Sequence, residues 1–204
     1  MKPTARGAAH RVRIIGGQWR RTPLAVVDAA GLRPTPDRVR ETLFNWLGND
    51  LSGLVCLDLY AGTGALGLEA ASRGAATVWL ADTEPRVQLA LQAIIERLKA
   101  GDRVQLYRGD ARGLLARLAQ QGVRADVVFI DPPFRQGVLD AVMPTLAPVL
   151  AREAWVYVET EAPLAAEQVV RWCGPDAQIV RQASAGQVHY HLLRIHSEAT
   201  QEKT

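Results

Sequence analysis

The stretch Asp58-Leu-Tyr-Ala-Gly62-Thr-Gly64-Ala-Leu-Gly67 follows the apolar run 54–57 and leads into a run with helical spacing. Its glycines have the GxGxxG spacing of a loop that joins a strand to a helix and lets the backbone approach a bound nucleotide closely. Enzymes of several classes carry such a loop, and a purely structural glycine turn can have the same spacing. The stretch therefore predicts a nucleotide-binding α/β fold and leaves the reaction open.

Strand and helix patterns alternate on the C-terminal side of this loop. Apolar, β-branched runs predict strands over 54–59, 76–81, 103–107, 126–130 and 154–158. Runs with helical spacing lie over 65–73, 85–99, 111–120 and 137–150, the last of which Pro144 and Pro148 should disturb. Strands joined through helices predict a mostly parallel, Rossmann-like sheet covered on both faces. Gln178–Gln182 and Val188–Ile195 have no helix between them, so a C-terminal antiparallel hairpin should close the sheet.

The residues before the loop predict a small extension of this α/β core. Alternating residues from Arg11 to Ile15, two glycines and the apolar run 24–27 indicate a β-hairpin. Thr35 and Pro36 suit the N-cap and the first position of a helix. The sequence thus predicts an N-terminal extension over 1–50, a core over 51–196 and a polar tail over 197–204.

Composition excludes several classes of protein. With 48% hydrophobic and 22% charged residues, the chain is neither disordered nor fibrous. No apolar run approaches the roughly 18 residues of a membrane helix, and residues 1–13 lack the apolar centre of a secretory signal. We therefore expect a cytoplasmic protein without a membrane partner. The two cysteines and four histidines have no metal-ligand spacing, so no metal is expected either.

Basic residues gather at the N-terminus, although the net charge of the chain is only +3. Residues 1–24 contain arginines and a lysine but no acid. Because the arginine fork binds phosphate oxygens, this asymmetry predicts a nucleic-acid partner. The arginines expected to contact it are Arg11, Arg13, Arg20, Arg21, Arg33, Arg38 and Arg40.

Acidic residues follow the predicted strands at their carboxyl ends, where open α/β sheets bind ligands. A carboxylate at Asp58 suits the cationic sulfonium and ammonium groups of S-adenosylmethionine better than a pyrophosphate. Asp82 and Glu84 are placed to accept hydrogen bonds from ribose hydroxyls, and Asp110 follows the next strand. Capping of the following helices is the alternative role for these three acids. The expected cofactor contacts are Asp58, Ala61, Gly62, Thr63, Gly64, Asp82, Glu84, Asp110 and Ala111.

The motif Asp131-Pro132-Pro133-Phe134 follows the strand 126–130 and predicts the reaction. The exocyclic amine of a nucleobase is a poor nucleophile because its lone pair is delocalised into the ring. The Asp131 carboxylate and the Pro132 carbonyl can accept its two hydrogens and turn the lone pair outward. Both prolines restrict the backbone and hold these acceptors in place, while Phe134 offers a surface on which an extruded base can stack. We therefore expect these four residues to form the catalytic site of a nucleic-acid amino-methyltransferase.

Several blocks together resemble the RsmD-type family of 16S ribosomal RNA guanine-N2 methyltransferases. The blocks are Arg13-Ile-Ile-Gly-Gly-Gln-Trp19, Leu32-Arg-Pro-Thr-Pro-Asp-Arg-Val-Arg-Glu-Thr-Leu-Phe-Asn-Trp-Leu47, Asp131-Pro-Pro-Phe134 and Ala185-Gly-Gln-Val188. The resemblance covers nearly the whole chain. It implies a class I methyltransferase fold, S-adenosylmethionine as the cofactor and transfer of a methyl group to N2 of a guanine in 16S rRNA.

The resemblance also implies roles for individual residues. The loop at Asp58, Gly62 and Gly64 would hold the cofactor, with Asp82 on the ribose and Asp110 near the adenine. The target amine would lie at residues 131–134. One departure concerns Asp82-Thr-Glu84, where the family pattern has Glu-x-Asp, so it is open which acid makes the ribose contact. Specificity for one guanine is expected to depend on an assembling or assembled small ribosomal subunit, because little surface outside the core is left to read a sequence.

Three other functions fit parts of the sequence. A DNA adenine-N6 or other nucleic-acid amino-methyltransferase would share the chemistry at Asp131, although the N-terminal blocks argue against it. A nicotinamide dehydrogenase would explain the glycine loop but not residues 131–134. A non-catalytic RNA-binding protein is disfavoured because no motif position is visibly altered.

Overall fold

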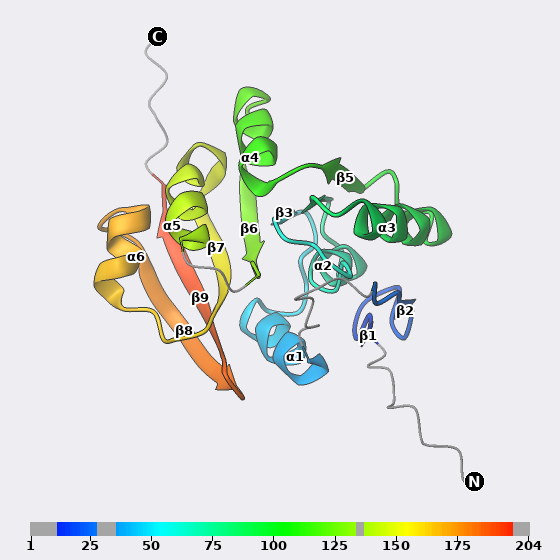
Figure 1. The fold of residues 1–204 in the computed structure, drawn as a ribbon, viewed down its shortest axis with the longest axis horizontal. Coiled ribbons are helices and arrows are strands. Elements are labelled where there is room, and N and C mark those ends of the chain that lie inside the picture. Colours follow the sequence, from blue (N-terminus) through cyan, green and yellow to red (C-terminus); the bar gives the residue numbers. More distant parts are fainter. Residues whose placement is uncertain (1–11, 28–35, 134–136, 198–204) are drawn as a thin grey trace, which may run out of the picture.

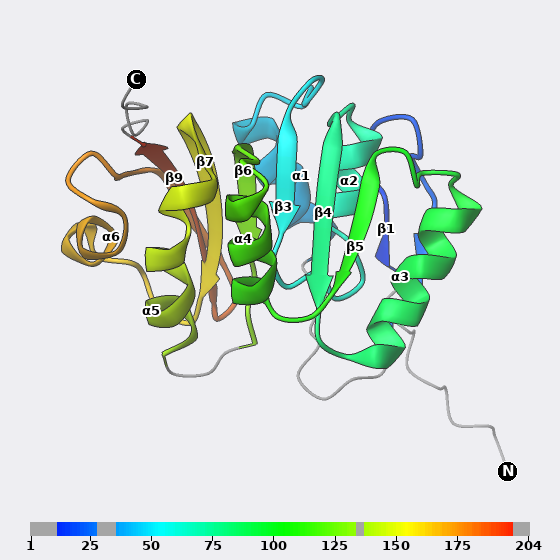
Figure 2. The same cartoon turned by 90° about the horizontal axis from the view of Figure 1, so that it is seen from above.

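One mixed sheet forms the centre of the computed structural model, which describes residues 12–27, 36–133 and 137–197 (Figures 1 and 2). Within these residues, seven strands pair in the order β5-β4-β3-β6-β7-β9-β8. The pairs from β5 to β7 are parallel, whereas β9 pairs antiparallel with both β7 and β8. The strands are β3 (Val55–Asp58), β4 (Thr77–Asp82), β5 (Val104–Arg108), β6 (Ala125–Ile130), β7 (Leu150–Thr160), β8 (Gln178–Ala185) and β9 (Val188–His196). This architecture confirms the predicted fold class.

Helices cover both faces of the sheet, as expected for parallel strands rich in apolar residues. Figure 2 shows α4 and α5 on one side and α1 and α2 on the other. Each face has its own apolar core, one containing Phe44, Phe129 and Tyr157 and the other Leu114, Val128 and Trp172. The helices are α1 (Asp37–Trp46), α2 (Gly67–Ser72), α3 (Pro85–Arg97), α4 (Ala111–Gln120), α5 (Val138–Val142) and α6 (Ala166–Cys173). None of the helices in the described ranges is long and apolar enough to cross a bilayer.

The order in which strands are added to the sheet reverses at β3, although β3 and β6 are parallel. From β3 the chain moves outward through β4 to β5, and it then returns to β6 on the other side of β3. In open α/β sheets ligands bind at such a switch point, beside the carboxyl ends of the two strands. Asp58 closes β3 and Asp131 directly follows β6, so both acids lie at this switch point.

The N-terminal extension packs directly onto the core. Strands β1 (Val12–Arg13) and β2 (Pro23–Leu24) form the expected hairpin, and Val12, Ile14 and Leu24 are buried in the same apolar core as α1 and α2. The backbone of the hairpin also bonds to α2, with 2.8 Å between the Gln18 amide and the Ser72 carbonyl. The hairpin is therefore part of the folded body. Helix α1 begins at Asp37, one residue later than predicted, and Thr35 lies outside the described residues.

The second half of the chain differs from the prediction in two elements. Instead of one helix over 137–150, the structure has α5 followed by the 3-10 turns η1 (Met143–Thr145) and η2 (Ala147–Val149). Each turn contains one of the two prolines, whose rings prevent a continuous helix. Helix α6 was not predicted, because only Val169 and Trp172 are buried among its eight residues and its apolar period is short.

Candidate active site

The glycine loop is held by two carboxylates, those of Asp58 and Asp82. Asp58, at the end of β3, accepts a hydrogen bond from the Gly67 amide at 2.8 Å and so joins the strand to the first turn of α2. Gly62 and Gly64 have φ angles of 50° and 76°, in the left-handed region that favours glycine. The Ala61 amide bonds to the Ala81 carbonyl at 2.9 Å, so the loop is also fixed to the end of β4. Thr63, next to these glycines, is 9% exposed.

Asp58 is buried below this loop, with 1% of its surface exposed. Burial raises the pKa of its carboxyl to about 7, and the Asp82 charge adds to this effect, whereas the amide of Gly67 opposes it. A nearby cation would favour the ionised form. The geometry adds a structural role, because Asp58 supports the loop from beneath. Its role towards a cofactor stays a prediction.

Asp82 and Glu84 are arranged differently at the end of β4. The half-buried Asp82 accepts hydrogen bonds from the amides of Gly62, at 3.0 Å, and Glu84, at 2.9 Å. Glu84 is exposed and caps α3, with 3.5 Å to the Arg86 amide. An ionised carboxylate accepts up to about four hydrogen bonds, so Asp82 can still bind a ribose hydroxyl. The structure brings Asp82 to the loop and directs Glu84 to the helix.

Asp110 is the N-cap of α4. Its carboxylate accepts a hydrogen bond from the Gly113 amide at 2.7 Å, and the next residue, Ala111, is buried in the core beside α4. The capping role is thus confirmed for both Glu84 and Asp110. Capping leaves the remaining lone pairs of each carboxylate available to a ligand.

The Asp-Pro-Pro segment extends from β6 at the same edge of the sheet. Asp131 is half-buried, Pro132 is buried and Pro133 is exposed, whereas Phe134 lies outside the described residues. Because β3, β4, β5 and β6 are parallel neighbours, Asp58, Asp82, Asp110 and Asp131 all follow strand ends at one edge. The acids predicted to serve the base and the cofactor therefore lie along one edge of the sheet, and their roles stay predictions.

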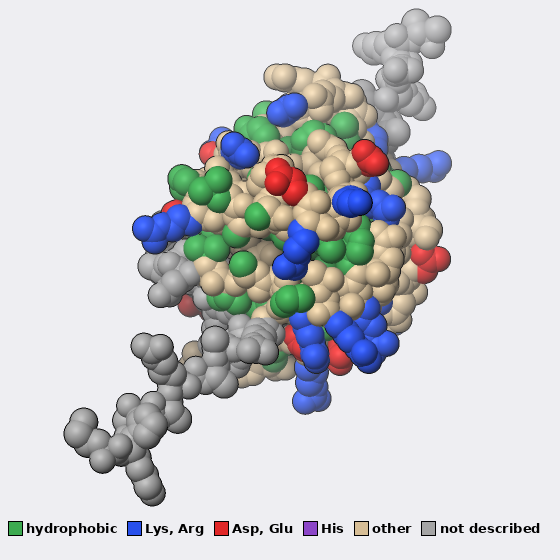
Figure 3. All heavy atoms as spheres, turned by 90° about the vertical axis from the view of Figure 1, so that its right-hand side faces the viewer, with side chains coloured by type: hydrophobic (Ala, Val, Ile, Leu, Met, Phe, Trp, Pro, Cys, Tyr) green, Lys and Arg blue, Asp and Glu red, His purple; other side chains and the backbone are tan. Residues whose placement is uncertain are grey.

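The hairpin arginines surround a separate polar hollow. This hollow has a volume of about 220 Å³ and is lined by Arg13, Ile14, Ile15, Arg20, Arg21 and Glu41. Basic side chains gather in the lower part of the face in Figure 3, at the height where Figure 1 places the β1–β2 hairpin. Arg38, on α1, is exposed as well. Arg11 and Arg33 lie outside the described residues.

The prediction that Arg40 contacts RNA is wrong. Its side chain is fully buried, donates to Asp37 at 2.6 Å and to the Arg13 carbonyl at 2.8 Å, and lies 3.6 Å from the carboxylate of Glu69. A phosphate cannot reach it there. Sequence reasoning also missed Glu69, although a lone acid within the apolar run 66–71 of a helix expected to be buried is a signal of such a pair.

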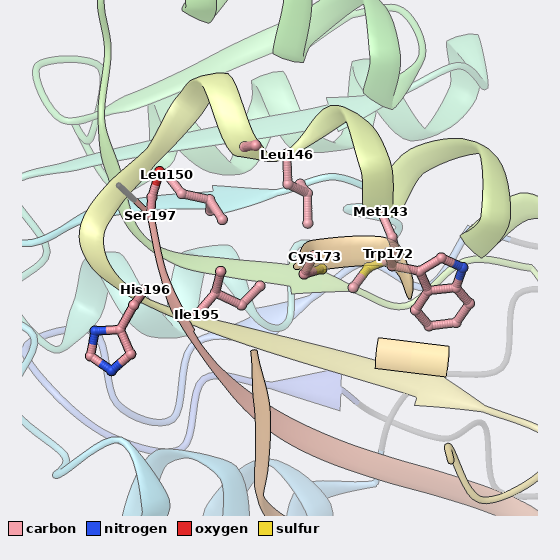
Figure 4. Close-up of a pocket in the computed structure, with 9 residues that line it drawn as sticks. Met143, Leu146, Leu150, Trp172, Cys173, Ile195, His196 and Ser197 are labelled. Carbon is pink, nitrogen blue, oxygen red and sulfur yellow. The ribbon is translucent and has the colours of Figure 1, made fainter. Parts of the chain in front are cut away.

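The apolar pocket of Figure 4 does not belong to this site. It is lined by residues that include Met143, Trp172 and Ile195, and it reaches Leu150, where β7 begins. The candidate site lies at the opposite edge of the sheet, where β6 and β7 end. With a volume of about 70 Å³, the pocket is also far smaller than the roughly 300 Å³ or more of a typical ligand site.

Among the described residues, no group of histidine, cysteine and acidic side chains could hold a metal ion.

Comparisons with known proteins place the chain in a family. The family described as conserved hypothetical protein 95 matches residues 12–194. Ribosomal RNA small subunit methyltransferase D of Escherichia coli is 43% identical over 95% of each chain. The solved structure of the Escherichia coli protein yhhF has a TM-score of 0.76 and 42% identity, and the match covers 92% of this chain and 99% of that one.

A more distant structure shows how widely the fold is shared. The RNA methyltransferase of Salinibacter ruber, solved with S-adenosyl-L-homocysteine, has a TM-score of 0.61 at 18% identity over 84% of this chain and 99% of its own. That likeness concerns the fold alone. The family match and the Escherichia coli relative both extend over nearly the whole chain, and the chain therefore belongs to the RsmD-type family of small-subunit ribosomal RNA methyltransferases.

Proposed function

We propose that this protein transfers a methyl group from S-adenosylmethionine to the exocyclic N2 amine of a guanine in 16S ribosomal RNA. The observation that carries the proposal is the position of Asp131. Asp131 follows β6 at the switch point of the sheet, and the glycine loop follows the neighbouring strand β3. The chain that carries both features belongs to the rRNA methyltransferase family. Asp131 and the glycine loop thus follow neighbouring strands, as an amine acceptor and a cofactor loop would need to.

The residues at the strand ends fit the cofactor. When bound, S-adenosylmethionine supplies an electrophilic methyl group on a sulfonium centre. Gly62 and Gly64 keep the loop backbone free of side chains, and the Asp58 carboxyl beneath it can offset the positive charge. Asp82 has lone pairs left for ribose hydroxyls, with Glu84 as the second candidate, and Asp110 and Ala111 lie on the adenine side in this proposal.

Asp131 and Pro132 act on the amine. In this proposal the Asp131 carboxylate and the Pro132 carbonyl accept the two N2 hydrogens, so that the nitrogen lone pair points at the methyl carbon. As the N–C bond forms, the bond between that carbon and sulfur breaks, and the surplus proton passes to the Asp131 carboxylate. Alignment of the two reacting atoms supplies most of the acceleration. Phe134 is proposed to stack on the guanine.

The hollow formed by the hairpin is proposed to hold RNA phosphates. Arg13, Arg20 and Arg21 line it together with Glu41, and Arg13 also pairs with Asp37 at 3.2 Å. Arg21 has a φ of 71°, a conformation that costs a non-glycine residue on the order of 1 kcal/mol and that is concentrated at functional sites. We propose that the substrate is 16S rRNA held in an assembling or assembled small subunit in the cytoplasm, with Arg38 as a further contact. The proposal invokes no metal ion.

Mass spectrometry of ribosomal RNA from a deletion strain tests this function. We expect one N2-methylguanosine to be lost from 16S rRNA, to return with a plasmid copy of the gene and not to return with the Asp131→Ala variant. An unchanged set of methylguanosines would contradict the proposal. Loss of N6-methyladenine from DNA in the same strain would favour the adenine alternative.

A further inference from the structure

A second carboxylate lies beside Asp131 on the neighbouring strand. Ile130 of β6 pairs with Val158 of β7, so the residues that follow, Asp131 and Glu159, come side by side at the strand ends. Side chains alternate along a strand, and Glu159 therefore faces the same side of the sheet as Tyr157. That side carries the core with Phe129 and Tyr157, towards α1.

Glu159 is held in a fixed position. The Tyr157 hydroxyl donates a hydrogen bond to its Oε1 at 2.8 Å, and only 4% of the residue is exposed. Tyr157 is itself fixed by the rings of Phe129 and Tyr190, at 6.5 and 6.4 Å. Burial, followed by the charges of Glu159 and Asp131, raises the pKa of Tyr157, so its hydroxyl remains a donor. These contacts orient the carboxylate before any substrate binds.

The hydrogen-bonding edges of the purines differ at the position next to the amine. Guanine presents N1–H beside its N2 amine, so a run of donors faces the protein. Adenine presents the acceptor N1 beside its N6 amine. Asp131 and Pro132 can accept amine hydrogens from either base, and they do not distinguish between the two. A carboxylate beside them attracts the N1–H of guanine and repels the N1 lone pair of adenine.

We propose that Glu159 makes this site selective for guanine by accepting the N1–H of the target base. The inference rests on the proposed function, because it needs a purine whose amine lies at Asp131. It assigns Glu159 to the substrate, whereas Tyr157 orients Glu159 from behind. Because Glu159 is shielded from water, a hydrogen bond to it competes little with solvent.

The test compares Glu159→Gln with a matched control on the same strand. Glutamine keeps the shape and an acceptor for the Tyr157 hydroxyl, while its NH₂ group donates to the N1 acceptor of adenine and opposes the N1–H of guanine. Glu153→Gln is the control, since this glutamate has a side chain 54% exposed at the start of β7, 4.0 Å from Arg194. The substrates are small subunits reconstituted with guanine or adenine at the position that the wild type modifies. Rates of methyl transfer, affinity for S-adenosylhomocysteine and thermal unfolding are measured for each protein.

We expect Glu159→Gln to lower kcat/KM on the guanine particle about 10- to 100-fold and to lower the guanine-to-adenine ratio by at least about 10-fold. Cofactor affinity and unfolding temperature should match those of Glu153→Gln and the wild type. An unchanged purine ratio would overturn the inference, whether the activity falls or persists, because a merely structural residue affects both substrates equally. A wild type that methylates no guanine would instead refute the proposed function, and this inference with it.

Discussion

Arg40 and Glu69 form an ion pair whose two side chains are completely buried, with 3.6 Å between Nη1 of Arg40 and Oε2 of Glu69. The pair joins α1 to α2. Glu69 also accepts hydrogen bonds from Nε of Arg73 at 2.8 Å and from the Ile15 amide at 2.7 Å, which adds the hairpin. One acid thus ties together three segments that are distant in sequence.

Glu69→Ala should lower the free energy of unfolding by about 3–5 kcal/mol, because the Ile15 amide and Arg73 lose their acceptor and the buried Arg40 keeps only Asp37 of its two acidic partners. Glu41→Ala, on the exposed side of α1, is the control and should change stability by less than about 0.5 kcal/mol. Urea unfolding measures both. Equal effects would mean that Asp37 and water compensate for the loss of Glu69.

Asp58 should make the protein less stable as the pH rises. Burial raises its folded-state pKa to about 7, above the unfolded value, so the folded state binds the extra proton in between. The stability that the protonated Asp58 carboxyl contributes to the folded state is therefore fully present below about pH 4. It is lost as the pH rises through about 7.

Asp58→Asn, which does not titrate, isolates this effect. From about pH 5 to about pH 8, the wild type should lose on the order of 3 kcal/mol of unfolding free energy relative to the variant. Urea unfolding across this range gives the difference, in which the other titrating groups cancel. Parallel curves for the two proteins would show that the Asp58 carboxyl is already ionised in the fold.

Asp131→Ala should slow methyl transfer on the order of 10²- to 10³-fold, because the amine loses the acceptor that orients it. Affinity for S-adenosylhomocysteine should stay unchanged, since the residue serves the base. Single-turnover rates and calorimetry separate the two effects. A parallel loss of cofactor affinity would assign Asp131 to the cofactor instead.

Arg20→Ala combined with Arg21→Ala should weaken RNA binding and flatten its salt dependence, because two phosphate contacts are lost from the hollow beside the hairpin. Point substitutions are needed here, since deleting residues 1–24 would also remove Val12, Ile14 and Leu24 from the core. Arg171→Ala, on the exposed side of α6, is the control. An unchanged slope of log affinity against log salt would mean that these arginines are merely solvated.

Small subunits or assembly intermediates should be methylated much faster than protein-free 16S rRNA. Apart from the parallel strands and their helices, the β1–β2 hairpin, α1 and the β8–β9 hairpin offer little surface, and phosphate contacts carry no sequence information. Initial rates on both substrates check this expectation. Equal rates on the same single guanine would show that the enzyme reads its target without the particle.

The order of the core elements, and the edge of the sheet that carries the candidate site, can be read from the amino-acid pattern. Both depend on local patterns: apolar runs specify the strands, glycines specify the loop after β3, and parallel strands place their carboxyl ends together. Asp58, Asp82, Asp110 and Asp131 could therefore be assigned to one edge before any contact was known. The capping roles of Glu84 and Asp110 followed from the same local chemistry.

The groups that lie against each side chain depend on the folded chain as a whole. The helical period places Arg40 off the main apolar stripe of α1. The β1–β2 hairpin and α2 nevertheless cover that flank of the helix, and Glu69, 29 positions away in the sequence, offsets the charge of Arg40. Glu159 likewise lies within an apolar strand pattern that gives no hint of Tyr157 holding it beside Asp131. Burial of a charge depends on partners distant in sequence, because desolvation is offset only where the fold brings an opposite charge or a hydrogen-bond donor into contact.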